Sequence, residues 1–264
     1  MYRLGILALD KERITKASLL SFGRAKKTET FVLDDKIELC AVYVGKSIKP
    51  LTKILSQNNI TIAVCTKAFF GKFGNITIDG MKIVDGISLY KKLIPDIVKK
   101  VAKMYFIDKN ECTLAVTCED VNLAMSIAEN LCRDFRYIKI IAKNKKTARD
   151  IADKILCEFG APIIITDFTT KTECDIAIKT GAHIPLVSKS AIVIDGCPEH
   201  TITKKNMINW IDVSPSYNLP YDIGSLSFAE AVMQVVGQEA DFKISCFKCG
   251  ANKAALDNLS VCVE

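Results

Sequence analysis

The feature that most constrains the fold is a regular alternation of short apolar runs with amphipathic segments between residues 113 and 195. The runs are rich in Val and Ile, which indicates strands buried on both faces and therefore a parallel sheet covered by helices. We expect an α/β protein whose larger part is a Rossmann-like doubly wound parallel sheet. The strands are expected at 113–117, 137–142, 162–166, 174–178 and 191–195, and the helices at 121–135 and 147–159.

The N-terminal part predicts a smaller α/β domain. Its apolar runs at 37–44 and 60–65 indicate strands around a helix at 47–57, and the glycine-punctuated stretch 71–86 indicates a hairpin or a loop with short strands. A long amphipathic helix is expected at 87–105, kinked or broken by its internal proline.

Charge and composition place the division between these parts. Residues 1–111 carry 20 Lys and Arg against 11 Asp and Glu, whereas residues 112–264 carry 16 against 19. We therefore expect a domain of residues 1–110 and a second domain of residues 111–264 that ends in a helix at 229–236, with Ser227 as its N-cap.

Composition also limits the functional classes. No segment is long and apolar enough for a signal peptide core or a membrane span, so we expect a soluble cytoplasmic protein without a membrane partner. The basic first part lacks interleaved aromatic residues, so nucleic acid is not the expected partner. The chain has 11 cysteines, and we interpret those within apolar runs, namely Cys40, Cys65, Cys118, Cys132 and Cys157, as reduced core thiols.

Three stretches within residues 113–196 resemble the nucleotide-binding domain of the shikimate dehydrogenase and glutamyl-tRNA reductase group. They are Ser126–Leu131, Ile140–Ala148, and Cys174–Ala182 followed by Ala191–Asp195. The second resembles the group's turn that grips an adenosine 2′-phosphate. The resemblance covers about a third of the chain and implies NADP as a cofactor and an oxidoreductase activity.

The turn after the first strand departs from that group. Aligned from Ile127 backwards, the three glycines of the phosphate-binding fingerprint fall at Glu119, Val121 and Ala124. The first two glycines allow the tight turn and the close approach of the pyrophosphate. Glu119 and Asp120 instead place two carboxylates at the positive end of a helix, where we expect them to cap the helix and repel an anion. NADP is therefore disfavoured, and no cofactor is assigned.

Seven residues would face a cofactor if one binds. Those in the first turn are Glu119 and Asn122, the second turn supplies Asn144, Lys145 and Lys146, and the fourth strand is followed by Thr180 and Gly181. Each set also has an interpretation without a cofactor. The lysines are equally typical of a solvent-exposed helix start, and Thr180-Gly181 is equally typical of a simple turn.

No catalytic residue can be assigned from the sequence. The lysine and aspartate motifs of the shikimate dehydrogenases are not found in residues 1–111, and Cys40 and Cys65, the candidates for a nucleophile, look like strand core. Neither histidine has a partner at the spacing of a nucleophile–base pair, although His183 could face a cleft.

No metal site is assigned. Two pairs with two-residue spacers have the form that zinc sites use. The pairs are Cys197 with His200 and Cys246 with Cys249, but they lie far apart in sequence, so whether they meet stays open.

Three functional classes remain. The first is a non-redox protein with a degenerate Rossmann-like domain, binding a small ligand or a protein partner in or near an interdomain cleft. The second is an NADP-dependent oxidoreductase with an unusual phosphate-binding turn. A binder of anions or RNA that uses the basic first part is the weaker third. A protein partner would require an exposed apolar patch or a defined homo-oligomer.

Overall fold

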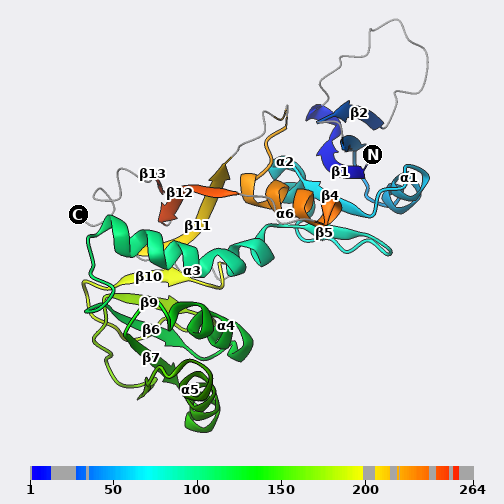
Figure 1. Cartoon of the computed structure of the whole chain (residues 1–264). Helices are drawn as coiled ribbons and strands as arrows, with labels where there is room; N and C mark the ends of the chain where they lie inside the picture. Colours follow the sequence, from blue (N-terminus) through cyan, green and yellow to red (C-terminus); the bar gives the residue numbers. More distant parts are fainter. Residues whose placement is uncertain are drawn as a thin grey trace, which may run out of the picture. The chain divides into compact units, whose positions relative to one another are not determined.

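The computed structural model describes residues 2–12, 28–33, 36–198, 206–214, 219, 221–237, 242–249 and 252–255. The chain forms two compact units (Figure 1). Unit 1 comprises Met1–Leu89 and Val213–Lys243, and unit 2 comprises Tyr90–Asp212 and Ile244–Glu264. This division differs from domains of residues 1–110 and 111–264, because the segment from Val213 returns to the first sheet. The segment belongs to unit 1 through contacts with residues distant in the sequence, which local sequence patterns do not show.

Unit 1 is built on a five-stranded mixed sheet of order β2-β3-β1-β4-β5. The strands β1, β3, β4 and β5 are parallel, and β2 pairs antiparallel with β3. Their bounds are Tyr2–Leu9 (β1), Thr28–Val32 (β2), Ile37–Val44 (β3), Ile62–Cys65 (β4) and Lys82–Val84 (β5). A 3-10 turn, Asp10–Glu12 (η1), follows β1.

Both faces of this sheet are covered. Helix α6 (Ser225–Val236) packs on one face, where Phe228 and Val232 join a cluster with Leu4 and Ile6 of β1. Helices α1 (Leu51–Gln57) and α2 (Lys67–Phe73) supply side chains to a second cluster that includes Leu7. Because β1 is buried on both faces, it is the centre of unit 1.

Unit 2 contains an eight-stranded sheet of order β13-β12-β11-β10-β9-β6-β7-β8, in which β6 to β11 are parallel. The parallel strands are Thr113–Thr117 (β6), Tyr137–Ala142 (β7), Ile163–Asp167 (β8), Ile176–Lys179 (β9), Ile192–Asp195 (β10) and Met207–Ser214 (β11). Strands Lys243–Cys249 (β12) and Asn252–Ala255 (β13) form an antiparallel pair.

The helices of unit 2 lie on one face of its sheet. Right-handed crossovers place α4 (Val121–Leu131) and α5 (Lys145–Phe159) on the same face. Helix α3 (Ile87–Met104) lies beside α4, because a Cβ on Gly196 would approach both Ile94 and Leu123. Over the opposite face, where Ala115 and Val193 are buried, the segment 168–187 packs Phe168, Ile184 and Val187.

The predicted fold class is confirmed: an α/β chain with a Rossmann-like, largely parallel sheet and a smaller N-terminal mixed sheet. The strands expected at 113–117 and 137–142 have the expected bounds. The sequence did not predict helix α2 or the strands β1, β2, β11, β12 and β13. The sequence also allows a short helix at 14–22, a range that lies outside the described residues.

Three local expectations need correction. Helix α4 ends at Leu131 rather than at Phe135, and α3 is not broken at Pro95, which rules out one of the two alternatives expected for that proline. Ser227 is not the N-cap of α6: Gly224 occupies that position, and the Ser227 hydroxyl donates to the backbone oxygen of Asp85 at 2.7 Å. The hydroxyl therefore ties the start of α6 to the loop after β5.

Gly86 offers a test of that packing. Its φ of 90° favours glycine, and a Cβ there would lie 2.9 Å from the Ser227 nitrogen, whereas Gly237 has a left-handed helical backbone with a φ of 70° and open space around it. We expect Gly86→Ala to lower the free energy of unfolding by about 2–3 kcal/mol, and Gly237→Ala by about 1 kcal/mol from backbone strain alone. Urea titrations followed by circular dichroism measure both, and equal losses would contradict the close packing.

Candidate functional site

The predicted site residues lie at the carboxyl edge of the unit 2 sheet. In open parallel sheets, ligands bind at this edge, where the strand order changes direction. Here that point lies between β6 and β9. The Thr180 backbone nitrogen donates to Thr117 Oγ1 at 2.8 Å, and Thr180 Oγ1 donates to the Thr117 backbone oxygen at 2.6 Å. Both side chains are buried, so these bonds fix the ends of β6 and β9 together.

The turn between β6 and α4 uses its backbone donors internally. The nitrogens of Glu119 and Asp120 each lie 3.3 Å from Thr180 Oγ1, and the Leu123 nitrogen donates to Asp120 Oδ1 at 3.0 Å. Asp120 is therefore the N-cap of α4, as predicted. Three N–H groups that could otherwise face a phosphate already have acceptors in the chain.

Glu119 binds the next loop, which corrects the expectation that it caps α4. Its Oε2 accepts a hydrogen bond from the His183 backbone nitrogen at 3.1 Å, and its Oε1 lies 2.5 Å from His183 Nδ1. The Glu119 side chain lies directly over Gly181, where an added Cβ would overlap Glu119 Cβ. Gly181 is thus required by the internal contact with Glu119, a reason that the sequence did not show.

The turn after β7 presents exposed lysines. Asn144 caps α5 by accepting a hydrogen bond from the Lys146 nitrogen at 3.0 Å, and Lys145 lies 3.9 Å from Asp167 at the end of β8. Lys143, Lys145 and Lys146 are exposed, as is Asn122 at the start of α4. Both interpretations of this cluster, a phosphate seat and a solvated helix start, fit these positions.

Phe168 joins the two parts of this edge. The Lys143 ammonium lies 5.3 Å from the centre of its ring, and the His183 ring meets it edge-on with the centroids 5.9 Å apart. Phe168 also packs on the cluster beneath the segment 168–187. The carboxyl edge is therefore occupied by a contiguous series of side chains from four strand ends.

A buried ion pair lies beneath this edge and was not predicted. Lys179 Nζ is 2.6 Å from Asp195 Oδ1, with both side chains at most 1% exposed. The Cys197 nitrogen also donates to Asp195 Oδ1, and among the described residues Asp195 Oδ2 has no hydrogen-bond partner. The sequence signal was present, because one charged residue closes each of two otherwise apolar strands.

Unit 1 has its own polar cluster at the carboxyl edge of its sheet. Glu12 Oε2 accepts hydrogen bonds from the Leu9 nitrogen at 2.6 Å and from Thr66 Oγ1 at 2.8 Å, and buried Thr66 caps α2. Next to Thr66, Lys67 pairs with Asp222 at 2.6 Å, and both of these side chains are 67% exposed. The ammonium of Lys67 and the carboxylate of Asp222 are thus accessible to solvent next to the buried hydroxyl of Thr66.

Two tyrosines belong to the same edge. The Tyr43 hydroxyl donates to Glu29 Oε2 at 2.6 Å and lies 2.6 Å from the Tyr221 hydroxyl. Burial, together with the hydrogen bond to Glu29, raises the pKa of Tyr43 above its ordinary value. Burial also raises the pKa of Tyr221. Both hydroxyls therefore stay protonated at neutral pH and can donate. The sequence placed Tyr43 in an apolar strand, and only the fold brings Tyr221 to it.

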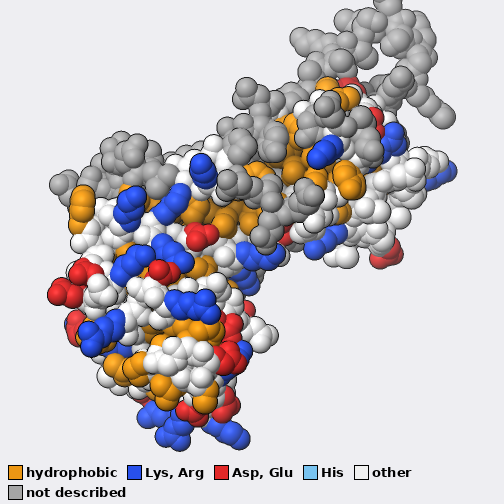
Figure 2. Space-filling model, viewed as in Figure 1, with side chains coloured by type: hydrophobic (Ala, Val, Ile, Leu, Met, Phe, Trp, Pro, Cys, Tyr) orange, Lys and Arg blue, Asp and Glu red, His pale blue; other side chains and the backbone are white. Residues whose placement is uncertain are grey.

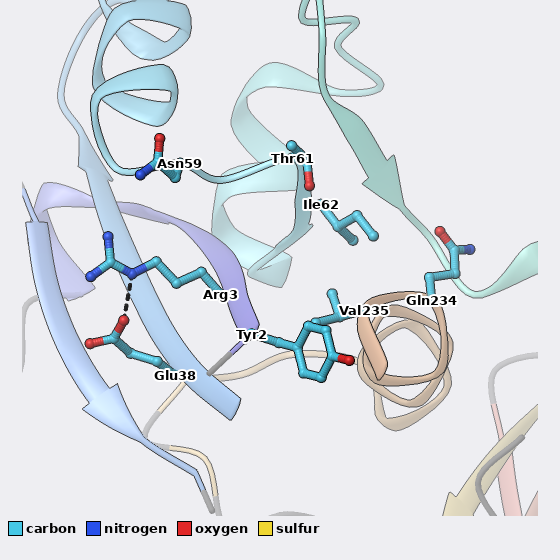
Figure 3. A pocket seen from close by; sticks show the side chains of 8 residues that line it. All are labelled: Tyr2, Arg3, Glu38, Asn59, Thr61, Ile62, Gln234 and Val235. Atoms are coloured by element: carbon cyan, nitrogen blue, oxygen red, sulfur yellow. Dashed lines mark hydrogen bonds and ion pairs between the residues drawn. The ribbon is translucent and has the colours of Figure 1, made fainter. Parts of the chain in front are cut away.

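The described part of unit 1 also has an open cavity of about 760 Å3 at the opposite, amino edge of its sheet (Figure 3). It is lined by Tyr2, Arg3, Glu38, Asn59, Thr61, Ile62, Gln234 and Val235. Arg3 pairs with Glu38 across the cavity wall and also donates to the Asn58 backbone oxygen. The two charged side chains of the lining, Arg3 and Glu38, are paired with one another, so the cavity presents no unpaired charge to a ligand.

Of the two cysteines considered as nucleophiles, Cys40 is a core residue and Cys65 is half-buried against the same cluster. Burial raises the pKa of Cys40, and it raises the pKa of Cys65 to about 12, so neither carries a thiolate at neutral pH. Cys40 is buried, in agreement with its interpretation as core. Cys157 is exposed on α5, which corrects its interpretation as a core thiol.

The pattern of zinc ligands is only partly described. His200 and the side chain of Cys249 lie outside the described residues. Cys197 Sγ donates to the Thr180 backbone oxygen at 3.2 Å, and Cys246 Sγ to the Phe247 backbone oxygen at 3.4 Å. Within the described ranges, no group of three or more His, Cys, Asp or Glu could hold a metal ion. Helices long and apolar enough to cross a bilayer are likewise absent from those ranges.

The comparisons with known proteins show a likeness of fold. No family model and no curated protein matches the chain. The structure resembles a 5-ketofructose reductase from a Gluconobacter species, with a TM-score of 0.40 and 14% identity over 91% of this chain and 94% of that chain. It also resembles a quinate dehydrogenase from Corynebacterium glutamicum, with a TM-score of 0.35 and 12% identity over 91% and 95%.

A shikimate 5-dehydrogenase from Listeria monocytogenes, solved with shikimate and NAD, gives a TM-score of 0.35 and 13% identity over 76% of this chain and 83% of that chain. The predicted resemblance to the shikimate dehydrogenase group is thus found in the structure as well. At this distance the likeness concerns architecture and does not transfer an activity or a ligand.

Alkylation tests the state of the thiols. At pH 8, iodoacetamide should label exposed Cys157 rapidly, while Cys65, whose pKa is raised to about 12, should stay unlabelled until the protein unfolds. The reason is that only the thiolate reacts. Peptide mass spectrometry over time gives both rates, and labelling of Cys65 as fast as Cys157 would show an accessible, reactive thiol.

Because Lys179 and Asp195 form a buried ion pair, we expect their substitutions to have non-additive effects on the free energy of unfolding. Lys179→Met leaves a buried carboxylate without its cation and should lower the free energy of unfolding by about 3–5 kcal/mol. Adding Asp195→Leu removes that charge, so the double variant should be more stable than Lys179→Met alone. Urea unfolding of the native protein, Lys179→Met, Asp195→Leu and the double variant measures the coupling, and a double variant no more stable than Lys179→Met would contradict it.

Proposed function

We propose that the chain is a non-redox protein in which the Rossmann-like domain is degenerate, and that it binds a small ligand or a protein partner. The carrying observation is Glu119, whose carboxylate is held by His183 directly over Gly181 at the start of α4. That position is where an incoming diphosphate would approach the helix N-terminus. The chain supplies its own anion there.

The electrostatics support this proposal. Two unit charges about 4 Å apart near a protein surface interact by roughly 1 to 4 kcal/mol, and a diphosphate would meet Glu119 as a like charge. To make room, Glu119 would lose two hydrogen bonds to His183. The nitrogens of Asp120 and Leu123 would also have to leave their internal acceptors.

The small-ligand arm of the proposal rests on the carboxyl edge of unit 1. Lys67 and Asp222 are accessible and of opposite charge, and the base beneath them includes the buried hydroxyl of Thr66. Such a set suits a small polar molecule with hydroxyl or carboxylate groups. Its expected location in or near an interdomain cleft remains a prediction.

An NADP-dependent oxidoreductase is the second candidate. The observation in its favour is the exposed lysine set Lys143, Lys145 and Lys146 at the carboxyl end of β7. By the resemblance to the shikimate dehydrogenase group, this turn would hold an adenosine 2′-phosphate. The cofactor would then enter with its diphosphate displaced from the turn that Glu119 blocks.

Titration calorimetry separates the two candidates. NADPH, NADP, NADH and ATP are titrated at low ionic strength into the native protein, Glu119→Gly, Glu119→Gln and the control Glu158→Gln, which changes an exposed carboxylate on α5. We expect no binding to the native protein or the control. Nucleotide binding should appear only when Glu119 is replaced. Removing the repulsion between Glu119 and the diphosphate should lower the dissociation constant by roughly a factor of ten or more.

Micromolar binding of NADPH to the native protein would contradict the proposal. If Lys143→Ala and Lys145→Ala then weakened the binding of NADPH more than that of NADH, the oxidoreductase candidate would be supported. Retained binding in both lysine variants would place the nucleotide away from the turn after β7.

A further inference from the structure

Strand β8 is an open edge of the unit 2 sheet. It pairs with β7, and no other strand in the described part of the chain pairs with its second side. Its sequence, Ile163–Asp167, contains no lysine and no proline, and Ile164 is 51% exposed. Natural edge strands usually carry such protective residues, because unpaired N–H and C=O groups are a template for another strand.

Helix α5 adds an apolar flank beside this edge. Ala148, Ile151 and Ile155 face the sheet. At about 100° per residue, Arg149, Ala152 and Leu156 then form a stripe along one side of the helix. Leu156 is 52% exposed.

Two ion pairs show which side of α5 this stripe occupies. Lys154 pairs with Glu129 of α4, so the side that carries Lys154 faces α4. Lys145, on the side of the stripe, lies near Asp167 at the end of β8. The stripe therefore borders the open edge of β8. Figure 2 shows hydrophobic side chains at the surface in the region where Figure 1 draws α4 and α5.

We propose that two copies of this chain join along β8, with the two strands antiparallel and the two α5 helices side by side on the same face. A two-fold axis perpendicular to the sheet generates this arrangement and uses the same surface on both copies. It continues the sheet through the contact and brings the exposed Ile164 side chains of both copies to one face as cross-strand neighbours. The strand pairing satisfies the open backbone groups of both edges.

The charges along α5 favour a second copy as the partner. The stripe carries Arg149 near the helix N-terminus, apolar Leu156 near the C-terminus, and small Ala152 between them. In an antiparallel helix pair, Arg149 of each copy would lie beside the C-terminal turn of the other helix. Cations stabilise the negative end of a helix, so the surface complements itself in this orientation.

Sedimentation of the full chain tests this proposal. The native protein should sediment as a dimer at micromolar concentrations, with twice the mass of the 29.1 kDa chain. Ile164→Lys, and independently Leu156→Lys, should sediment as monomers, because each introduces a charge on both sides of the axis. The matched control is Val32→Lys, since Val32 is 67% exposed on the edge strand of the other sheet and belongs to neither β8 nor α5; this variant should remain a dimer.

Hydrogen exchange locates the contact. The amides of residues 163–167 should exchange more slowly in the native protein than in Ile164→Lys, and their protection should fall on dilution. A native monomer, a dimeric Ile164→Lys or a monomeric Val32→Lys would each overturn the proposal. If Ile164→Lys does not fold by circular dichroism, Leu156→Lys decides. A dimer whose 163–167 amides are unprotected would show that the copies join elsewhere.

Discussion

The parallel strands of unit 2 have to be covered on both faces, and the rest of that unit follows from how the covering is achieved. Three helices lie on one face, whereas the segment 168–187 packs on the other through Phe168, Ile184 and Val187. A covering segment without a helix must return to the strand ends, because it connects them. This return brings Phe168 and His183 to the carboxyl edge, where they meet Lys143 and Glu119.

The same constraint explains how the carboxyl edge differs from a nucleotide-binding turn. In a glycine-rich turn, the backbone itself approaches the phosphates. Here Glu119 extends over Gly181 and holds the His183 loop, while Thr180 and Asp120 accept the hydrogen bonds of the turn. The interactions that fix the loop over the sheet are therefore the ones that take up the donors of the turn. A diphosphate would need the same backbone nitrogens, those of Asp120 and Leu123, that already donate to Thr180 and Asp120 within the fold.

Unit 1 shows a complementary organisation. Its central strand β1 is buried on both faces, and polar groups gather where β1, β3 and β4 end. Tyr43 and Tyr221 come from segments 178 residues apart, yet their hydroxyls lie 2.6 Å from one another. The return of the chain from Val213 is what completes this edge. Unit 1 therefore depends on residues on both sides of unit 2 in the sequence.

The sequence by itself determined the α/β class, the strands from 113 to 142 and the cap at Asp120, because these depend on local patterns of apolar and polar residues. It could not show that Glu119 binds His183, that Lys179 and Asp195 form a buried pair, or that Val213–Lys243 belongs with the first sheet. Each of these interactions joins residues distant in the chain. Local sequence patterns do not show which distant residues a side chain will contact in the folded protein. Only the tertiary structure decides whether a carboxylate at a helix start caps the helix, meets a ligand or holds another loop.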